Sequence, residues 1–187
     1  MSKASQFIIL CEDKLQEVFV RKFLKNYDVP HRAIYPVALP NGNGCGEQHV
    51  RTRYPKEIRA YRDRQSKAKT VLIVVIDADT GTVENRQSQL NNAAQSAGVA
   101  PRSDGEHVVH LVPKRHIETW LAFLSNANDV NEDAEYKPLY SFRGNESKSH
   151  SLVDMFTGMF RHHQPAPESL PSLKQALEEL ERLREIL

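Results

Sequence analysis

Two aspartates, Asp77 and Asp79, directly follow the most strand-like segment of the chain, VLIVVI at Val71–Ile76. Residues two positions apart in an extended backbone point to the same side, so both carboxylates are expected to face one point. Mg²⁺ and Mn²⁺ prefer such oxygen ligands. Without a cation the two acids would repel each other, and one would take up a proton. The spacing therefore indicates a site for a divalent metal.

Further acidic residues follow two other strand-like segments. Glu12 comes directly after Phe7–Cys11, with Glu17 beyond it, and Glu118 lies in the first turn after His107–Val112. A single acid in such a position often only caps the next helix, and this alternative stays open for Glu12 taken alone. Acids on neighbouring strands of one sheet favour a metal site instead. The candidate metal ligands are Glu12, Glu17, Asp77 and Asp79.

The elements that must position these acids alternate between strand and helix. We expect strands at Phe7–Cys11, Ala33–Leu39, Val71–Ile76 and His107–Val112. Helices are expected between Glu12 and Asn26 and at Pro55–Arg64, Thr82–Ala97 and Ile117–Leu124. This alternation predicts an α/β fold, a doubly wound and mainly parallel four-stranded sheet flanked by helices. In such folds the working site lies at the carboxyl ends of the strands.

The C-terminal third of the chain is expected to be an extension of this core. Residues 127–187 form an irregular segment and C-terminal helices that pack on the α/β core of residues 1–126. The polar stretch at 126–149 lacks a period, whereas Leu152–Phe160 and the Leu- and Glu-rich Leu173–Leu187 have helical spacing. The last of these could dock on another subunit or form a homodimer.

Two short motifs carry a resemblance to a known family. The first predicted strand ends in glutamate at Leu10–Glu12, and a later strand ends in VIDAD at Val75–Asp79. In this order the chain resembles a Toprim domain, the fold shared by topoisomerases, bacterial primases and the overcoming-lysogenization-defect nucleases. The resemblance covers roughly the first two-thirds of the chain.

A closer likeness is to small bacterial Toprim-like proteins found near anti-phage and mobile-element genes. It rests on CED at Cys11–Asp13, GNGCGEQ at Gly42–Gln48 and RHIETWL at Arg115–Leu121. The resemblance implies Glu12 as general acid/base or metal ligand, Asp77 and Asp79 as metal ligands, and Glu118 as a further acidic contributor. The chain departs from the family in two places. Asp13 stands where the family usually has glycine, and Gln16 stands where it often has an acid.

A dense basic segment follows the glycine-rich loop at Pro40–Gly46. Its arginine and lysine side chains could hold a phosphate backbone together with the N–H groups of residues 44–47. The alternative is a solvated helix face without a ligand. The glycines match neither the Walker nor the dinucleotide fingerprint. The basic residues of this segment are His49, Arg51, Arg53, Lys56, Arg59, Arg62 and Arg64.

Basic residues also lie near the other predicted site residues. Lys114 and Arg115 precede Glu118, where Lys114 could stabilise charge developing on a phosphoryl group or simply pair with the acid. Arg143 and Lys148, in the irregular segment, could fold over the same edge. The candidate nucleic-acid contacts are Arg51, Arg53, Lys56, Arg115, Arg143 and Lys148. The candidate catalytic residues are Glu12, Asp77, Asp79, Glu118 and Lys114.

Composition limits the function classes. The 187 residues are 40% hydrophobic with a net charge of +1, so any nucleic-acid surface must be local. We expect no membrane span and no signal peptide, and we expect Cys11 and Cys45 to be unpaired, which favours a cytoplasmic location. Trp120 and Cys11 are expected in the core.

The leading functional hypothesis is a Mg²⁺- or Mn²⁺-dependent phosphodiesterase, a nuclease acting on DNA or RNA in phage defence or mobile-element biology. The alternative is a non-catalytic Toprim-like subunit or sensor in a larger defence assembly. A receiver-like domain with Asp77 as phosphate acceptor is weaker, because no convincing set of lysine and hydroxyl residues accompanies it.

Overall fold

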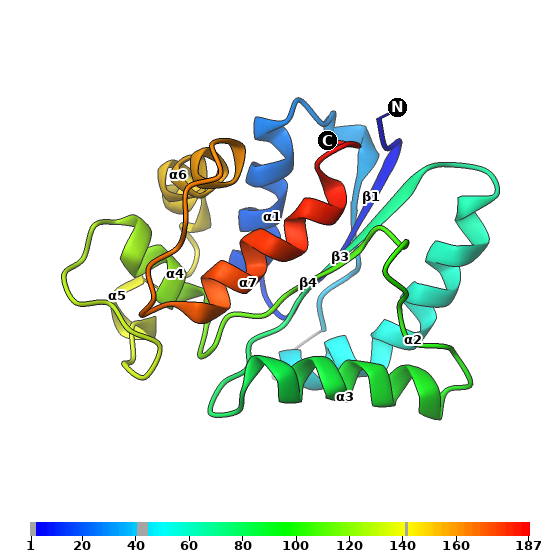
Figure 1. The fold of residues 1–187 in the computed structure, drawn as a ribbon, viewed down its shortest axis with the longest axis horizontal. Helices are drawn as coiled ribbons and strands as arrows, with labels where there is room; N and C mark the ends of the chain where they lie inside the picture. Colours follow the sequence, from blue (N-terminus) through cyan, green and yellow to red (C-terminus); the bar gives the residue numbers. More distant parts are fainter. Residues whose placement is uncertain (1–2, 41–44, 141) are drawn as a thin grey trace.

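A four-stranded parallel sheet forms the centre of the protein in a computed structural model that describes residues 3–40, 45–140 and 142–187 (Figure 1). The strands are β1 (Gln6–Leu10), β2 (Ile34–Pro36), β3 (Thr70–Val75) and β4 (Val108–Leu111), in the order β2-β1-β3-β4. All three strand pairs are parallel. The predicted α/β class and doubly wound parallel sheet are confirmed.

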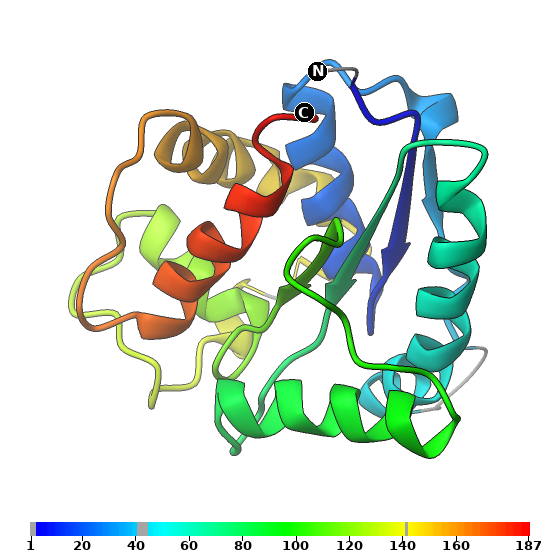
Figure 2. The same ribbon diagram turned by 45° about the vertical axis from the view of Figure 1, so that its right-hand side comes forward.

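Helices cover both faces of the sheet because its strands are apolar on both faces. All six residues of β3 are buried. Ile73 and Val75 pack towards α1 (Lys14–Asn26), α4 (Ile117–Leu124), α6 (His150–Arg161) and α7 (Pro171–Leu180). Leu72 and Val74 pack towards α2 (Gly46–Gln65) and α3 (Val83–Ser96). Figure 2 shows these two groups of helices on opposite sides of the strands.

Helix α2 is longer than predicted. Its predicted start at Pro55 is wrong, because the helix begins at Gly46 and carries Pro55 in its interior. Proline there removes one backbone hydrogen bond of the helix. Val50, Tyr54 and Ile58 are fully buried at helical spacing, and this burial keeps the helix continuous. Strand β2 is shorter than predicted, since the 3₁₀ turn η1 (His31–Ala33) takes its first residue.

Most of the remaining boundaries follow the predictions. Helix α4 has the predicted bounds, and Trp120 in it is fully buried and stacked on Phe156, with ring centroids 6.3 Å apart. The stretch at 126–149 contains α5 (Lys137–Tyr140) and the 3₁₀ turn η2 (Glu146–Ser149). Within the described residues, no helix is long and apolar enough to cross a membrane.

Helix α7 closes the open side of β4. It ends at Leu180 and continues as the 3₁₀ turn η3 (Glu181–Leu183), so the prediction of one helix to Leu187 is wrong. Its apolar residues Leu173 and Leu180 are buried in the same core as α1, and the face proposed for docking is therefore used within the chain. Glu179 Oε2 accepts a hydrogen bond from the backbone N–H of His110 in β4, 3.2 Å away.

The order of the strands fixes the position of a functional site. The chain leaves β1 for β2 on one side and later returns to β3 on the other side of β1. In open parallel sheets this change of direction leaves a crevice outside the carboxyl ends of the two central strands. Glu12 and Asp77 follow those two ends, so the fold brings these two predicted acids to the point where the strand order changes direction.

Candidate functional site

Glu12 and Asp77 are in direct contact at the carboxyl ends of β1 and β3. The backbone N–H of Asp77 donates to Oε1 of Glu12, with an N–O distance of 2.7 Å. Asp77 is only 5% exposed. Two segments separated by 65 positions therefore meet here through the Glu12 side chain and the Asp77 backbone. We call the acids gathered here the carboxylate edge: Glu12, Asp13, Asp77, Asp79 and Glu118.

Gln16 ties the two strand ends together. Its Nε2 donates to Oδ1 of Asp77 at 2.9 Å, and its Oε1 accepts from the backbone N–H of Glu12 at 2.9 Å. The side chain is fully buried. Sequence analysis noted Gln16 only as a departure from an acidic position. In the structure a neutral donor lies against Asp77, where a further carboxylate would add repulsion.

Asp13 has a structural role at the start of α1. Its Oδ1 accepts from the backbone N–H of Gln16 at 2.9 Å, which is the bond of a helix N-cap. Glycine at this position would lack that acceptor. Asp13 also adds negative charge beside Glu12 and Asp77.

Backbone hydrogen bonds hold Asp79 at the carboxylate edge, while its side chain faces the guanidinium group of Arg86. The N–H groups of Ala78 and Asp79 donate to the carbonyl oxygens of Pro113 and Arg115, at 2.8 and 3.2 Å. The side chain of Asp79 is 56% exposed, and its Oδ2 lies 3.3 Å from Nη2 of Arg86. Arg86, in α3, also contacts Glu47 at the start of α2. Arg86 is not among the predicted site residues, because no local sequence pattern indicates its contact with Asp79.

The electrostatics of the edge favour protonation of three of its acids, Glu12, Asp77 and Glu118. Burial raises the pKa of Glu12 to about 7, with neighbouring Asp79 and Asp13 adding to it. Burial also raises the pKa of Asp77 well above its ordinary value, and Glu12 is the largest of the acidic neighbours that raise it further. Burial raises the pKa of Glu118 to about 7. A cation would relieve the repulsion that the ionised acids impose on one another.

The start of α2 lies against Glu12 at very short range. A Cβ atom placed on Gly46 would lie 2.8 Å from both Cβ and the carbonyl oxygen of Glu12. Only glycine permits this approach of two backbones. The glycine of the predicted loop therefore serves packing at the edge, while residues 41–44 of that loop lie outside the described part of the chain.

The donor atoms suit a hard divalent cation, although their present arrangement is not that of a closed metal site. Within the described residues, no group of three or more His, Cys, Asp or Glu side chains is placed to hold a metal ion. The acidic side chains do not converge because they have other partners. Glu12 accepts a hydrogen bond from the backbone N–H of Asp77, and Asp79 faces Arg86. To share one ion, these two side chains would have to exchange those partners for the cation.

A second part of the site lies on the α1 side of the edge. Glu118, buried in the first turn of α4, and Asp13 line a pocket of about 310 Å³. Arg143 reaches the same pocket from the irregular segment, which brings it beside the acids as the sequence suggested. We call this space the edge pocket; its lining residues are Asp13, Lys14, Leu15, Glu118, Lys137, Arg143 and Glu146.

Three predicted site residues make their contacts elsewhere. Glu17 is buried and pairs with Lys14 and Arg21 along α1, at 3.0 and 2.7 Å. Lys114 Nζ donates to the carbonyl oxygen of Gly81 at 2.5 Å. The guanidinium of Arg115 donates to the carbonyl oxygen of Asp133 at 3.0 Å, although its backbone supports Asp79.

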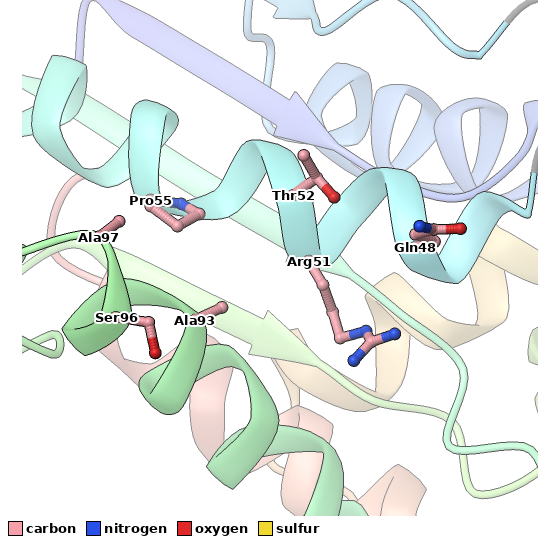
Figure 3. A pocket seen from close by; sticks show the side chains of 7 residues that line it. All are labelled: Gln48, Arg51, Thr52, Pro55, Ala93, Ser96 and Ala97. Atoms are coloured by element: carbon pink, nitrogen blue, oxygen red, sulfur yellow. The ribbon is translucent and has the colours of Figure 1, made fainter.

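The basic segment of α2 is mostly paired with neighbouring groups. Arg51 pairs with Glu47 at 2.5 Å, and Arg53 pairs with Glu57 at 2.9 Å. Figure 3 shows Arg51 extending over a pocket of about 410 Å³ between α2 and α3. Lys56 and Lys148 are exposed, with no ion pair among the residues that the structure describes. The edge pocket is lined by neither α2 nor Lys148.

No protein-family model, curated protein or solved structure matches this chain.

Proposed function

We propose that the protein is a Mg²⁺- or Mn²⁺-dependent phosphodiesterase acting on nucleic acid, with its site at the carboxylate edge. The observation that carries the proposal is the contact of Glu12 with Asp77 at the switch point of the sheet, 2.7 Å from carboxyl oxygen to backbone nitrogen. Burying acids together is costly unless a cation or a proton compensates. A site that gathers them at the crevice of a parallel sheet fits metal-assisted phosphoryl chemistry.

The residues of the chain have distinct roles in this proposal. Asp77 and Asp79 supply ligand oxygens, and Glu12 supplies a ligand or a general base, because its pKa of about 7 suits proton transfer near neutral pH. Gln16 fixes the orientation of Asp77. A bound Mg²⁺ would lower the pKa of a water and neutralise charge on phosphoryl oxygens. In this proposal Lys137 and Arg143, which line the edge pocket, bind the phosphate of the substrate.

The proposal extends to the family and the biological setting. The Glu12 and Asp77–Asp79 motifs follow strands β1 and β3 in the order typical of Toprim domains, and we infer that the chain is a Toprim-like nuclease of phage defence or mobile elements. We place this activity in the cytoplasm. Both cysteines are free, Cys11 buried and Cys45 exposed, which agrees with a reducing compartment.

The experiment compares the wild type with Asp77→Asn. Hydrolysis of bis(p-nitrophenyl) phosphate and of labelled DNA and RNA is measured with Mg²⁺, with Mn²⁺ and with EDTA. We expect metal-dependent cleavage by the wild type and a loss of roughly 1,000-fold in the variant. Asparagine keeps the acceptor for Gln16 and removes a crowded charge, so the variant should unfold at the wild-type temperature or above it.

Asp63→Asn is the matched control, since Asp63 is an exposed acid in the last turn of α2. It should retain full activity. Cleavage by Asp77→Asn at the wild-type rate would remove the proposed mechanism, as would cleavage that persists in EDTA.

One observation favours a second candidate, a non-catalytic subunit. Arg86 occupies Asp79 and Glu47 at the same time, so the described side chains form an ion-pair network where a metal site is proposed. In this alternative the paired acids and Arg86 stabilise the fold, and the protein acts through a partner. Isothermal titration with Mn²⁺ separates the two candidates: heat of binding that Asp77→Asn abolishes supports the enzyme, and its absence in the wild type supports the subunit.

A further inference from the structure

A basic groove runs along the exposed side of α1 and shares one lining residue, Lys14, with the edge pocket. It is a concavity of about 320 Å³ lined by α1 side chains, by His31 before β2, and by His150 at the start of α6. Sequence analysis did not single it out. We call it the α1 groove, and its charged α1 residues are Lys14, Glu17, Arg21, Lys22 and Lys25.

Helical spacing aligns the cations of the groove. Lys14, Arg21 and Lys25 are separated by seven and four positions, so they form one stripe opposite the buried face of α1. From Lys14 to Lys25 the helix rises roughly 16 Å. A stripe of this length exceeds the size of a single phosphate and fits an extended polyanion.

The charges of the groove are only partly balanced. Glu17 is buried beneath Lys14 and Arg21 and pairs with both, which fixes the two cations at the groove surface. Lys22 pairs with Asp154 at 2.5 Å. Lys25 is exposed, and its side chain makes no hydrogen bond or ion pair with other described residues. Four cations against two acids leave two positive charges, with both histidines counted as neutral.

Lys14 connects the groove to the proposed catalytic site. It lines the α1 groove and also the edge pocket, where Asp13 and Glu118 represent the carboxylate edge. Lys137 and Arg143 add two more cations within that pocket. Positive side chains therefore follow one another from Lys25, over Lys14, to the acids at the ends of β1 and β3.

We propose that the α1 groove binds the phosphodiester backbone of the nucleic-acid substrate, several residues of the strand away from the phosphate at the carboxylate edge. The inference rests on the proposed function, which supplies the reason for a polyanion to reach the edge. Cations arranged in a stripe contact phosphates without reading bases, so the groove contributes affinity rather than sequence specificity. The contact would be the same for a DNA and an RNA strand.

The test measures binding without catalysis. Fluorescence anisotropy follows labelled single-stranded DNA and RNA oligonucleotides of mixed sequence in EDTA, over a series of salt concentrations. We expect the double variant Lys22→Gln/Lys25→Gln to bind roughly tenfold more weakly at low salt than the wild type, with a slope of log affinity against log salt that is smaller by about 1.4. The control Lys3→Gln/Lys67→Gln removes two exposed charges that do not line the α1 groove, and it should bind as the wild type does.

The outcomes separate this inference from the proposed function. Hydrolysis of bis(p-nitrophenyl) phosphate depends on the metal site alone, so the groove variant should retain it in full while losing oligonucleotide binding. No binding by the wild type, or an equal loss in the control, overturns the groove as a substrate contact even if the small diester is cleaved. A glutamate-rich peptide is tested in the same way. If it binds the wild type as tightly as the oligonucleotides do, and if the groove variant no longer binds it, the groove belongs to acidic protein partners and the inference is overturned.

Discussion

The basic side chains on the two sides of the carboxylate edge differ in how they are paired with acids. On the α2–α3 side, Arg86 is paired with Glu47 and Asp79, and Arg51 is paired with Glu47. On the α1 side, Lys14 and Arg21 share the buried Glu17, and the side chain of Lys25 has no partner among the described residues. The first side thus joins two helices through a shared arginine, while the second, in the part of the chain that the structure describes, leaves the Lys25 side chain unpaired beside the α1 groove.

This difference shows that the density of basic residues in a sequence is a poor guide to a binding surface. Helix α2 has more arginines than α1, but its acids at i and i+4 neutralise them locally. Others bind the backbone of the adjoining loop: Arg59 donates to Ala97, and Arg62 donates to Ala100 and Pro101. Only tertiary structure reveals which cations remain available.

The largest effect is expected where α2 meets the edge through its backbone. Gly46→Ala would place a methyl group 2.8 Å from Glu12, so we expect a loss of roughly 2 kcal/mol in the free energy of unfolding and a marked fall in metal-dependent hydrolysis. Gly105→Ala is the control, since nothing lies within 4 Å of its added Cβ. Urea denaturation measures both variants. A Gly46→Ala protein as stable and active as the control would show that α2 does not constrain the edge.

The pH dependence of the free energy of unfolding tests whether the pKa of Glu12, at the carboxylate edge, is raised in the folded protein. The pKa of Glu12 is raised in the folded protein from 4.5 to about 7, so its contribution to stability is present below 4.5 and is lost as the pH rises through about 7. In EDTA the wild type should lose roughly 3 kcal/mol more than Glu12→Gln over this range. Mn²⁺ should reverse the loss. Parallel curves for the two proteins, measured by denaturation at each pH, would contradict the raised pKa.

Removing a paired basic side chain from α2 should lower the free energy of unfolding and leave oligonucleotide affinity nearly unchanged. Arg62 contacts Glu106 at 2.6 Å and two carbonyl oxygens at 2.9 Å, so Arg62→Ala should lower the free energy of unfolding by about 1 kcal/mol. Lys56→Ala, which breaks no such bond, should change it by less than about 0.5 kcal/mol. Oligonucleotide affinity should stay within about twofold of the wild type in both. A large loss of affinity in Arg62→Ala would make α2 part of the binding surface.

The smallest expected effect is an increase in oligonucleotide affinity, in contrast to the losses predicted above. Glu17→Gln frees Lys14 and Arg21 from their shared acid, so oligonucleotide affinity should rise roughly threefold at low salt despite a slight loss of stability. Glu57→Gln makes the same change beside Arg53 on α2 and should leave affinity unchanged. Anisotropy titrations measure both. Weaker binding by Glu17→Gln would show that Glu17 organises the groove more than it neutralises it.

The sequence was sufficient for the sheet and for the meeting of Glu12 with Asp77. Continuous apolar runs predict buried parallel strands, and the acids that follow such strands must lie at one edge. The start of α2 was mispredicted because Pro55 resembles a helix start, whereas burial of Val50 and Tyr54 extends the helix past it. The bonds of Gln16 to Asp77 and of Arg86 to Glu47 join segments 61 and 39 positions apart, and no local pattern encodes them.

Both margins of the sheet are protected against strand addition. Pro36 in the three-residue β2 has no N–H to offer a neighbouring chain, and on the other margin Glu179 takes the outward N–H of His110 in β4. A fully parallel sheet is slow to assemble and exposes its margins while it does so. By accepting this N–H group, Glu179 of α7 leaves β4 with one fewer free backbone donor for a strand of another molecule.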